Sequence, residues 1–169
     1  MEDHTIFERA SVRAYTDEPI TDAQIEDLMR AAMAAPSAGN QQPWEFYVVQ
    51  NHDLLAQLAT VSPYAGPVGK APLGIVACVR KDTLKHLGFE SQDMGACVEN
   101  LLLEATNLEL GAVWLGIAPI QERMDAVARV LDIPAALEPF AIIAVGHPAG
   151  QTRITGPKRF DPERIHVVA

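Results

Sequence analysis

Two arginines and a serine near the start of the chain have the spacing expected of an anion-binding site. Arg9, Ser11 and Arg13 lie within five residues of one another. Because each guanidinium presents a rigid fork of N–H donors, this cluster suits a phosphate monoester, which carries about −1.5 to −2 charge. The alternative is two solvated arginines at the surface, where most arginines lie.

A second polar segment, 36–43, has the sequence Pro-Ser-Ala-Gly-Asn-Gln-Gln-Pro. Its terminal prolines restrict the backbone, and Gly39 permits close approach to a ligand. Three of its side chains carry groups that suit the edge of a heteroaromatic ring, namely Ser37, Asn40 and Gln42. The alternative is an ordinary loop between a helix and a strand.

Two later segments have features that suit the same ligand. Gly116 falls in a strand-like run, 113–117, and would leave backbone groups open to a flat molecule. A glycine that is merely packed within a strand is the simpler explanation. Lys158 and Arg159 begin a basic patch in an otherwise acidic chain.

Other kinds of catalytic site have no candidate in the sequence. The five histidines are never three to five residues apart, and Cys78 and Cys97 stand in apolar surroundings without a nearby thiol. Dinucleotide, P-loop and nucleophile-elbow motifs are also missing from the sequence. We therefore expect no metal site and no catalytic side chain, and an enzyme of this sequence would take its reactivity from a cofactor.

The composition is that of one globular domain over residues 1–169. The chain has 13 Lys and Arg against 22 Asp and Glu, a net charge of −9, and 49% hydrophobic residues. Such an acidic balance argues against nucleic acid and anionic membrane surfaces as partners. No apolar run approaches the ~20 residues that span a bilayer, and no export signal is recognisable, so we expect a cytoplasmic protein.

Apolar spacing predicts the helices that would position these segments. A capping-box pattern at Thr21 opens a helix that should end near Ala35, because Pro36 disfavours helical geometry in the residue before it. A longer helix is predicted from a cap at Ser91 to about Leu110. Two further helices are predicted over residues 53–60 and 121–131.

Strands are predicted between these helices. Aromatic, β-branched and continuous apolar runs indicate strands over 44–49, 73–79, 112–116 and 140–145, with a possible fifth over 165–168. Residues 61–72, rich in proline and glycine, predict an irregular surface loop. Taken alone, the alternation of strands and helices favours a parallel sheet.

The four polar segments, in this order and spacing, resemble the flavin mononucleotide (FMN)-dependent nitroreductase family. The resemblance rests on the Arg-x-Ser-x-Arg start, the Pro-Ser-x-x-Asn-x-Gln-Pro-Trp loop, Gln92-Asp93, the Ala-Val-Trp-Leu-Gly run ending at Gly116, Val145-Gly146-His147-Pro148 and the Arg-Phe-Asp-Pro tail. These matches run nearly from end to end of the chain.

The resemblance implies a role for each matching residue. Arg9, Ser11 and Arg13 match the motif that holds the flavin phosphate and ribityl chain, with Arg159 and Lys158 as late basic contacts. Residues matching a loop that reaches the flavin ring from the partner subunit are Pro36, Ser37, Asn40 and, on the same loop, Gln42. Leu115 and Gly116 match the backbone beside the reactive edge of the ring.

The resemblance also implies a fold and an assembly. The family fold is α+β, a three-layer α/β/α arrangement with a mostly antiparallel central sheet, and this expectation replaces the parallel one. The family forms an intertwined homodimer. In it the C-terminal tail pairs with the partner subunit, and the apolar helix 94–108 would lie in the dimer core.

Three functional hypotheses follow. The leading one is an FMN-dependent oxidoreductase that takes hydride from NADH or NADPH and reduces nitroaromatic, quinone or related small-molecule acceptors by a ping-pong mechanism. The second is a non-catalytic module that binds, stores or senses flavin. The third, a purely structural dimer, would leave Arg9, Arg13 and Arg159 without a role.

Overall fold

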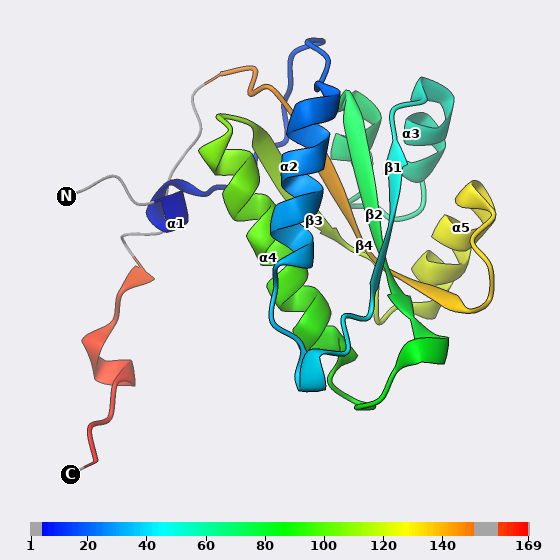
Figure 1. Cartoon of the computed structure of the whole chain (residues 1–169). Helices are drawn as coiled ribbons and strands as arrows, with labels where there is room; N and C mark the ends of the chain where they lie inside the picture. Colours follow the sequence, from blue (N-terminus) through cyan, green and yellow to red (C-terminus); the bar gives the residue numbers. More distant parts are fainter. Residues whose placement is uncertain (1–4, 151–158, 169) are drawn as a thin grey trace.

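A four-stranded antiparallel sheet forms the centre of the protein (Figure 1). The computed structural model describes residues 5–150 and 159–168. The strands, in spatial order, are β1 (Trp44–Val49), β2 (Leu73–Arg80), β4 (Leu137–Gly146) and β3 (Gly111–Gly116). Each neighbouring pair is antiparallel. The antiparallel sheet that the resemblance implies is confirmed. The parallel expectation is wrong, because the order of elements along a chain does not specify strand direction.

Helices cover both faces of this sheet and complete the three layers. On one face lie α2 (Asp22–Met33) and α4 (Glu90–Asn107), and on the other α3 (His52–Leu58) and α5 (Gln121–Leu131) (Figure 1). A short α1 (Thr5–Glu8) precedes them. Single 3₁₀ turns are η1 (Ala38–Asn40), η2 (Gly66–Lys70), η3 (Lys81–Thr83) and η5 (Pro162–Arg164).

Side-chain alternation along the central strands explains the two hydrophobic cores. On β2, Ile75 and Ala77 face the core beneath α2 and α4, whereas Val76 and Cys78 face the core beneath α3 and α5. Successive side chains of a strand point to opposite faces, so a sheet covered on both sides needs a continuous apolar run. The predicted buried strand over 73–79 is confirmed, as is burial of both cysteines.

Local signals place some helix ends correctly and others wrongly. Thr21 and Gln24 form the predicted capping box of α2, which ends two residues before Ala35. In contrast, α4 begins at Glu90 after Phe89, without a side-chain cap, so the predicted cap at Ser91 is wrong. Packing of the apolar stripe of α4 against the sheet fixes this helix without a cap.

The segment 61–72 is more ordered than predicted. It contains η2, and the small apolar residues Ala65, Val68 and Ala71 are buried in the core beneath α3. The expectation of an irregular surface loop is therefore only partly correct. Its prolines and glycines shape a compact turn whose apolar side chains still reach the interior.

The C-terminal tail forms no strand within the described residues 159–168. Val167 and Val168 are 88% and 93% exposed, and the tail extends away from the body of the molecule beyond α1 (Figure 1). The strand predicted over 165–168 is absent from this segment, because a strand requires a neighbouring backbone to pair with. Its pairing with a partner subunit remains a prediction.

Candidate functional site

The N-terminal cluster lies along the outer edge of β3. Ser11 forms a parallel bridge with Ala112, and the Val12 backbone N–H donates to the Ala112 carbonyl at 3.0 Å. A Cβ atom on Gly111 would lie 2.6 Å from Cγ1 of Val12, so only glycine allows this approach. The structure thus brings the Arg-x-Ser-x-Arg motif and the predicted strand 112–116 together.

This edge presents hydrogen-bond donors to solvent. Arg13 is exposed, and its Nη1 donates to the backbone carbonyl of Ser11 at 3.2 Å. Within the described part of the chain, the exposed hydroxyl of Ser11 has no hydrogen-bond partner. Arg9 is more buried and pairs with Glu99 of α4, with 3.1 Å between Nε and Oε1. Arg13 and Ser11 are therefore the most available donors, whereas Arg9 shares its charge with a carboxylate.

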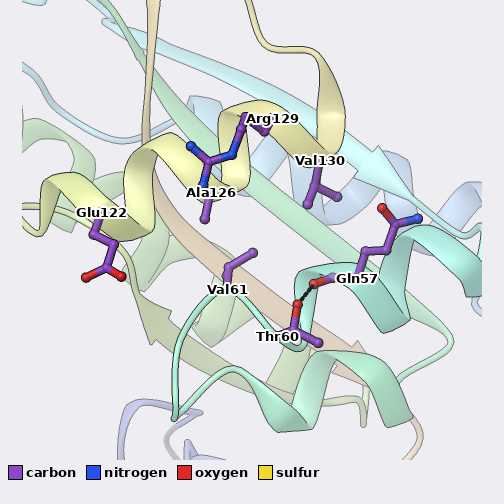
Figure 2. A pocket seen from close by; sticks show the side chains of 7 residues that line it. All are labelled: Gln57, Thr60, Val61, Glu122, Ala126, Arg129 and Val130. Carbon is purple, nitrogen blue, oxygen red and sulfur yellow. Dashed lines mark hydrogen bonds between the residues drawn. The ribbon is translucent and has the colours of Figure 1, made fainter.

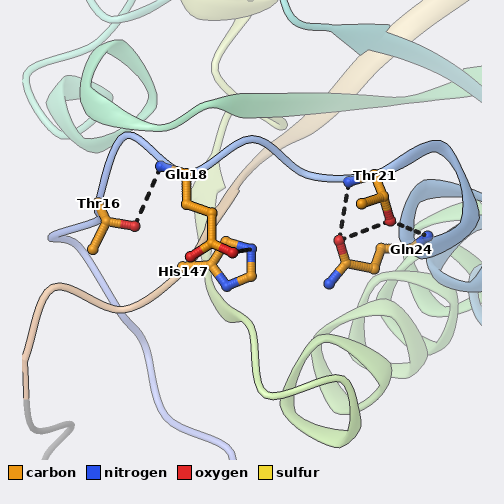
Figure 3. A network of polar contacts seen from close by, with 5 residues as sticks. All are labelled: Thr16, Glu18, Thr21, Gln24 and His147. Atoms are coloured by element: carbon orange, nitrogen blue, oxygen red, sulfur yellow. Dashed lines mark hydrogen bonds and ion pairs between the residues drawn. The ribbon is translucent and has the colours of Figure 1, made fainter.

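Tyr15 anchors the residues that follow the cluster. Its hydroxyl lies 2.6 Å from the Val12 carbonyl oxygen and 3.2 Å from that of Ala144 in β4. Just beyond it, the Thr16 N–H donates to the carbonyl of His147 at 2.9 Å, and the His147 imidazole faces Glu18 (Figure 3). These contacts fix the arginine cluster to the end of the sheet.

Burial makes the stability of the protein depend on pH through Tyr15. Burial raises the pKa of its phenol well above the ordinary value of 10.0, and the charge of Arg13 opposes this shift. Because the folded-state pKa exceeds the unfolded one, the stabilisation is fully present below about pH 10 and is lost as the pH rises. We expect the free energy of unfolding to fall above pH 10 by up to about 1.4 kcal/mol per pH unit from this group.

Urea unfolding between about pH 8 and pH 11 measures this slope. In Tyr15→Phe the free energy of unfolding should fall less steeply with pH than in the unmutated protein. The difference in slope should be up to about 1.4 kcal/mol per pH unit, which corresponds to about one proton. Burial also raises the pKa of the Cys78 and Cys97 thiols to about 12, but their contribution is common to both proteins. Equal slopes in the two proteins would contradict the assignment to Tyr15.

The loop 36–43 has an unusual backbone that exposes its polar side chains. Gly39, Asn40 and Gln42 have φ angles of +52°, +53° and +47°. Asparagine tolerates this left-handed region, but glutamine rarely adopts it. Ser37 Oγ accepts from the Gln42 N–H at 3.0 Å. Pro36 and the side chains of Asn40 and Gln42 are exposed, and no described residue hydrogen-bonds those two amides.

Two buried residues lie beneath this loop, and the sequence analysis assigned a role to neither of them, although Asp93 belongs to the Gln92-Asp93 match. Asp93 accepts from the Ala38 N–H at 2.9 Å and from the Gln41 side-chain amide at 2.7 Å. Only 8% of Gln41 and 5% of Asp93 are exposed. The available signal was helical spacing, because Asp93 falls on the same stripe of α4 as Cys97 and Leu101 and should be buried with them.

The end of β3 offers backbone rather than side-chain contacts. Gly116 is exposed, and a Cβ atom placed on it would have no heavy atom within 4 Å. The Ala112 carbonyl points away from β4, because it accepts from the Val12 N–H. In an antiparallel edge strand the N–H and C=O groups of successive residues point alternately toward and away from the neighbouring strand. The backbone groups of Gly116, four residues further on, therefore also point away from β4, and those of Leu115 point toward it. The Gly116 carbonyl accepts from Arg123 at 3.1 Å. The Leu115 side chain is buried, which limits any ligand contact of that residue to its backbone.

The remaining predicted residues lie in the C-terminal segment. Arg159 is exposed at the start of the described tail, and Lys158 lies outside the described residues. The tail extends away from the sheet (Figure 1), so these residues stay predictions for an assembled site.

One chain does not bring the arginine cluster and the loop 36–43 to the same side of α4. The loop is held by Asp93, whereas Arg9 is held by Glu99, six residues further along the helix. This offset corresponds to about 9 Å along the axis and about 120° around it. The arginine cluster and the loop 36–43 of one chain therefore contact different sides of α4.

The sequence as a whole matches a known family. A model of the Nitroreductase family matches residues 6–87 and 62–147, which together span most of the chain. The chain belongs to the nitroreductase family. The resemblance found in the sequence is therefore confirmed, and the family consists of oxidoreductases.

Individual nitroreductase-like proteins match over almost the whole chain. A protein of Archaeoglobus fulgidus, provisionally named an NADH dehydrogenase/NAD(P)H nitroreductase, is 38% identical, with 95% of this chain and 94% of the relative covered. A crystal structure from Clostridium acetobutylicum, provisionally named an NADH oxidase, is 42% identical, covers 97% and 98% of the two chains, and has a TM-score of 0.93. A nitroreductase-like structure from Desulfovibrio desulfuricans in complex with FMN is 33% identical, covers 92% of each chain, and has a TM-score of 0.76.

A prominent hollow of the protein lies away from the candidate site. A groove of about 400 Å³ runs between α3 and α5 (Figure 2), lined by Gln57, Thr60, Val61, Glu122, Ala126, Arg129 and Val130. None of the residues predicted from the sequence lines it. Among the helices of residues 5–150 and 159–168, none has the length and apolarity to cross a bilayer, and these ranges contain no cluster of metal ligands.

Proposed function

We propose that this nitroreductase is an FMN-dependent oxidoreductase that takes hydride from NADH or NADPH and reduces nitroaromatic, quinone or related conjugated acceptors. One observation carries the proposal. The exposed donors of Ser11 and Arg13 lie on the same strand edge as Gly116, which is exposed and has open space where a Cβ atom would lie. An anion at one end of this edge and a flat ring at the other match the two parts of FMN.

The chemistry of the donors fits FMN. A guanidinium and a hydroxyl can donate several charge-assisted hydrogen bonds to a phosphate, and the net charge of −9 makes a cationic cluster at this point distinctive. We propose that Arg13 and Ser11 hold the phosphate, with Arg9 beside them and Arg159 and Lys158 as further basic contacts. Gly116 would lie against the ring, with Leu115 contributing only backbone.

A second copy of the chain would complete the site. The loop side chains of Asn40 and Gln42 are exposed. Their loop, however, contacts a different side of α4 from Arg9. We propose a homodimer in which Pro36, Ser37, Asn40 and Gln42 of one copy approach the ring bound by the other. The exposed tail, with Val167 and Val168, would pair with the second copy, and the dimer would be cytoplasmic.

FMN, when bound, supplies the capacity to accept hydride at its ring and to pass it on. The residues of the chain bind and orient that ring, and none of them is proposed as acid, base or nucleophile. Positive charge from the arginine cluster favours an anionic ligand. The nicotinamide donor and the acceptor would use one open face in turn, which gives ping-pong kinetics.

Anaerobic mixing of the FMN-loaded protein with NADH or NADPH tests this function. We expect rapid bleaching of the long-wavelength flavin band, followed by recovery when a quinone or nitroaromatic acceptor is added. A protein that binds FMN but is not bleached by either nucleotide would instead be a flavin-storage or flavin-sensing module. A protein that acquires no flavin absorbance from FMN would contradict both functions.

A further inference from the structure

A buried carboxylate and a buried amide fasten the loop 36–43 to the start of α4. One Asp93 oxygen accepts from the Ala38 N–H at 2.9 Å, and the other accepts from Gln41 Nε2 at 2.7 Å. Both partners are N–H donors, so the two carboxylate oxygens are occupied by the loop. The contact joins residues more than 50 positions apart in the sequence.

The same glutamine binds a third segment. Gln41 Oε1 accepts from the backbone N–H groups of Lys85 and His86 at 3.0 and 2.9 Å. Its Nε2 also lies 3.3 Å from the His86 carbonyl oxygen. One amide therefore connects the loop 36–43, the start of α4 and the segment 85–86. Its orientation is fixed, because its oxygen faces N–H donors and its nitrogen faces acceptors.

This arrangement is exceptional within the molecule. In the described ranges, the buried polar side chains are Gln41, Asp93 and Ser62. A buried carboxylate destabilises a fold unless it is hydrogen-bonded, and a satisfied buried network makes the segments that it joins rigid.

What the network holds in place is the strained part of the loop. Gln41 lies between Asn40 and Gln42, which both have positive φ angles without being glycine. His86 packs so closely on Gly39 that a Cβ atom there would lie 2.0 Å from its Nε2. Strained backbone persists where surrounding contacts over-determine it.

We propose that Gln41 and Asp93 are positioning residues for FMN, acting as a latch that holds Ser37, Asn40 and Gln42 in the conformation that meets the ring. This inference rests on the proposed function. Both residues lie beneath the loop, so they act through it and do not touch the ligand. Asp93 belongs to the Gln92-Asp93 match of the family resemblance, which gave it no role, and Gln41 falls on an unspecified position of the loop motif.

The direction of the hydrogen bonds provides the test. Asp93→Asn places an amide N–H donor opposite the N–H donors of Gln41 Nε2. If the Gln41 amide turned over to avoid this contact, its N–H groups would instead face the backbone N–H groups of Lys85 and His86. Gln41→Glu instead sets two carboxylates against each other. The double variant Gln41→Glu/Asp93→Asn restores every hydrogen bond of the network except the 3.3 Å contact of Gln41 Nε2 with the His86 carbonyl. In it, the carboxylate at position 41 would accept from both backbone N–H groups and from the amide nitrogen at position 93. The amide oxygen at position 93 would still accept from the Ala38 N–H.

Titration of the full-length variants with FMN, followed by flavin fluorescence and by the absorption spectrum of the bound form, measures the effect. Each single substitution should raise the FMN dissociation constant at least about tenfold, as expected when a hydrogen bond to a charged group is lost. The double variant should return to within about threefold of the unmutated protein and regain its bound-flavin spectrum. Ser62→Ala is the matched control, because it removes the third buried polar side chain, whose Oγ accepts a part-buried hydrogen bond from the Tyr64 N–H, and it should leave FMN affinity unchanged.

Single variants with unaltered affinity would overturn the latch, as would a double variant that stays weak. If a single variant does not fold, the double variant decides by the same criterion. Absence of FMN binding by the unmutated protein would instead refute the proposed function, and the latch for FMN with it.

Discussion

Replacement of Arg13 by alanine is expected to weaken FMN binding by about 1.5–3 kcal/mol, or roughly 10- to 150-fold in the dissociation constant. The Arg13 guanidinium is exposed beside Ser11, and among the described residues no carboxylate pairs with it. Its charge is therefore available to a phosphate. Flavin fluorescence titration at fixed ionic strength measures the loss.

Two further arginines provide the comparison for that experiment. Arg9→Ala should weaken binding less than Arg13→Ala, because Glu99 already compensates part of the Arg9 charge. Arg30→Ala removes an equal charge from the exposed face of α2, where Arg30 pairs with Glu26, and should leave FMN affinity unchanged. Equal losses in all three variants would indicate a general electrostatic effect and contradict a phosphate site at Arg13.

Replacement of Leu101 by alanine is expected to lower the free energy of unfolding by about 2–5 kcal/mol. Leu101 is 0% exposed in the middle of α4, where it belongs to the core between the helices and the sheet. Truncation leaves a cavity in addition to the loss of buried apolar surface. Urea unfolding at one fixed protein concentration is the measurement, because a dimer couples stability to concentration.

An exposed leucine gives the control for Leu101. Leu87 is 77% exposed, so Leu87→Ala should change the free energy of unfolding by no more than about 0.5 kcal/mol. If Leu101→Ala lowered the free energy of unfolding by less than about 1 kcal/mol, the result would contradict the close packing of Leu101 between α4 and the sheet.

The elements with strong local signals could be predicted closely from the sequence. The strand 44–49 and the helix 121–131 have the predicted bounds, and the capping box at Thr21 places the start of α2. The strand predicted from Phe140 begins three residues earlier, at Leu137, because Pro139 obscures its beginning. Strand direction had no local signal and was correct only through the family resemblance.

The candidate site was predictable in its parts but not in its arrangement. The motif around Ser11 and the exposed amides of the loop 36–43 follow from residue type and spacing. The latch between Gln41 and Asp93 depends on contacts between residues far apart in sequence, which no local pattern encodes. The separation of Arg9 from the loop likewise depends on where each meets α4.

A mixed dimer tests most directly whether the FMN site is built from two copies. One copy would carry Arg13→Ala and the other Asn40→Ala, with different affinity tags so that the heterodimer can be isolated. If each site takes Arg13 from one copy and Asn40 from the other, the heterodimer has one intact site and one doubly defective site.

Equilibrium titration of this heterodimer with FMN gives the answer. The account predicts one FMN bound with the affinity of the unmutated protein, and no comparable binding at the second site. Two weakened sites, one lacking Arg13 and the other lacking Asn40, with none of unmutated affinity, would contradict it, because that result requires Arg13 and Asn40 of the same copy to meet at one flavin.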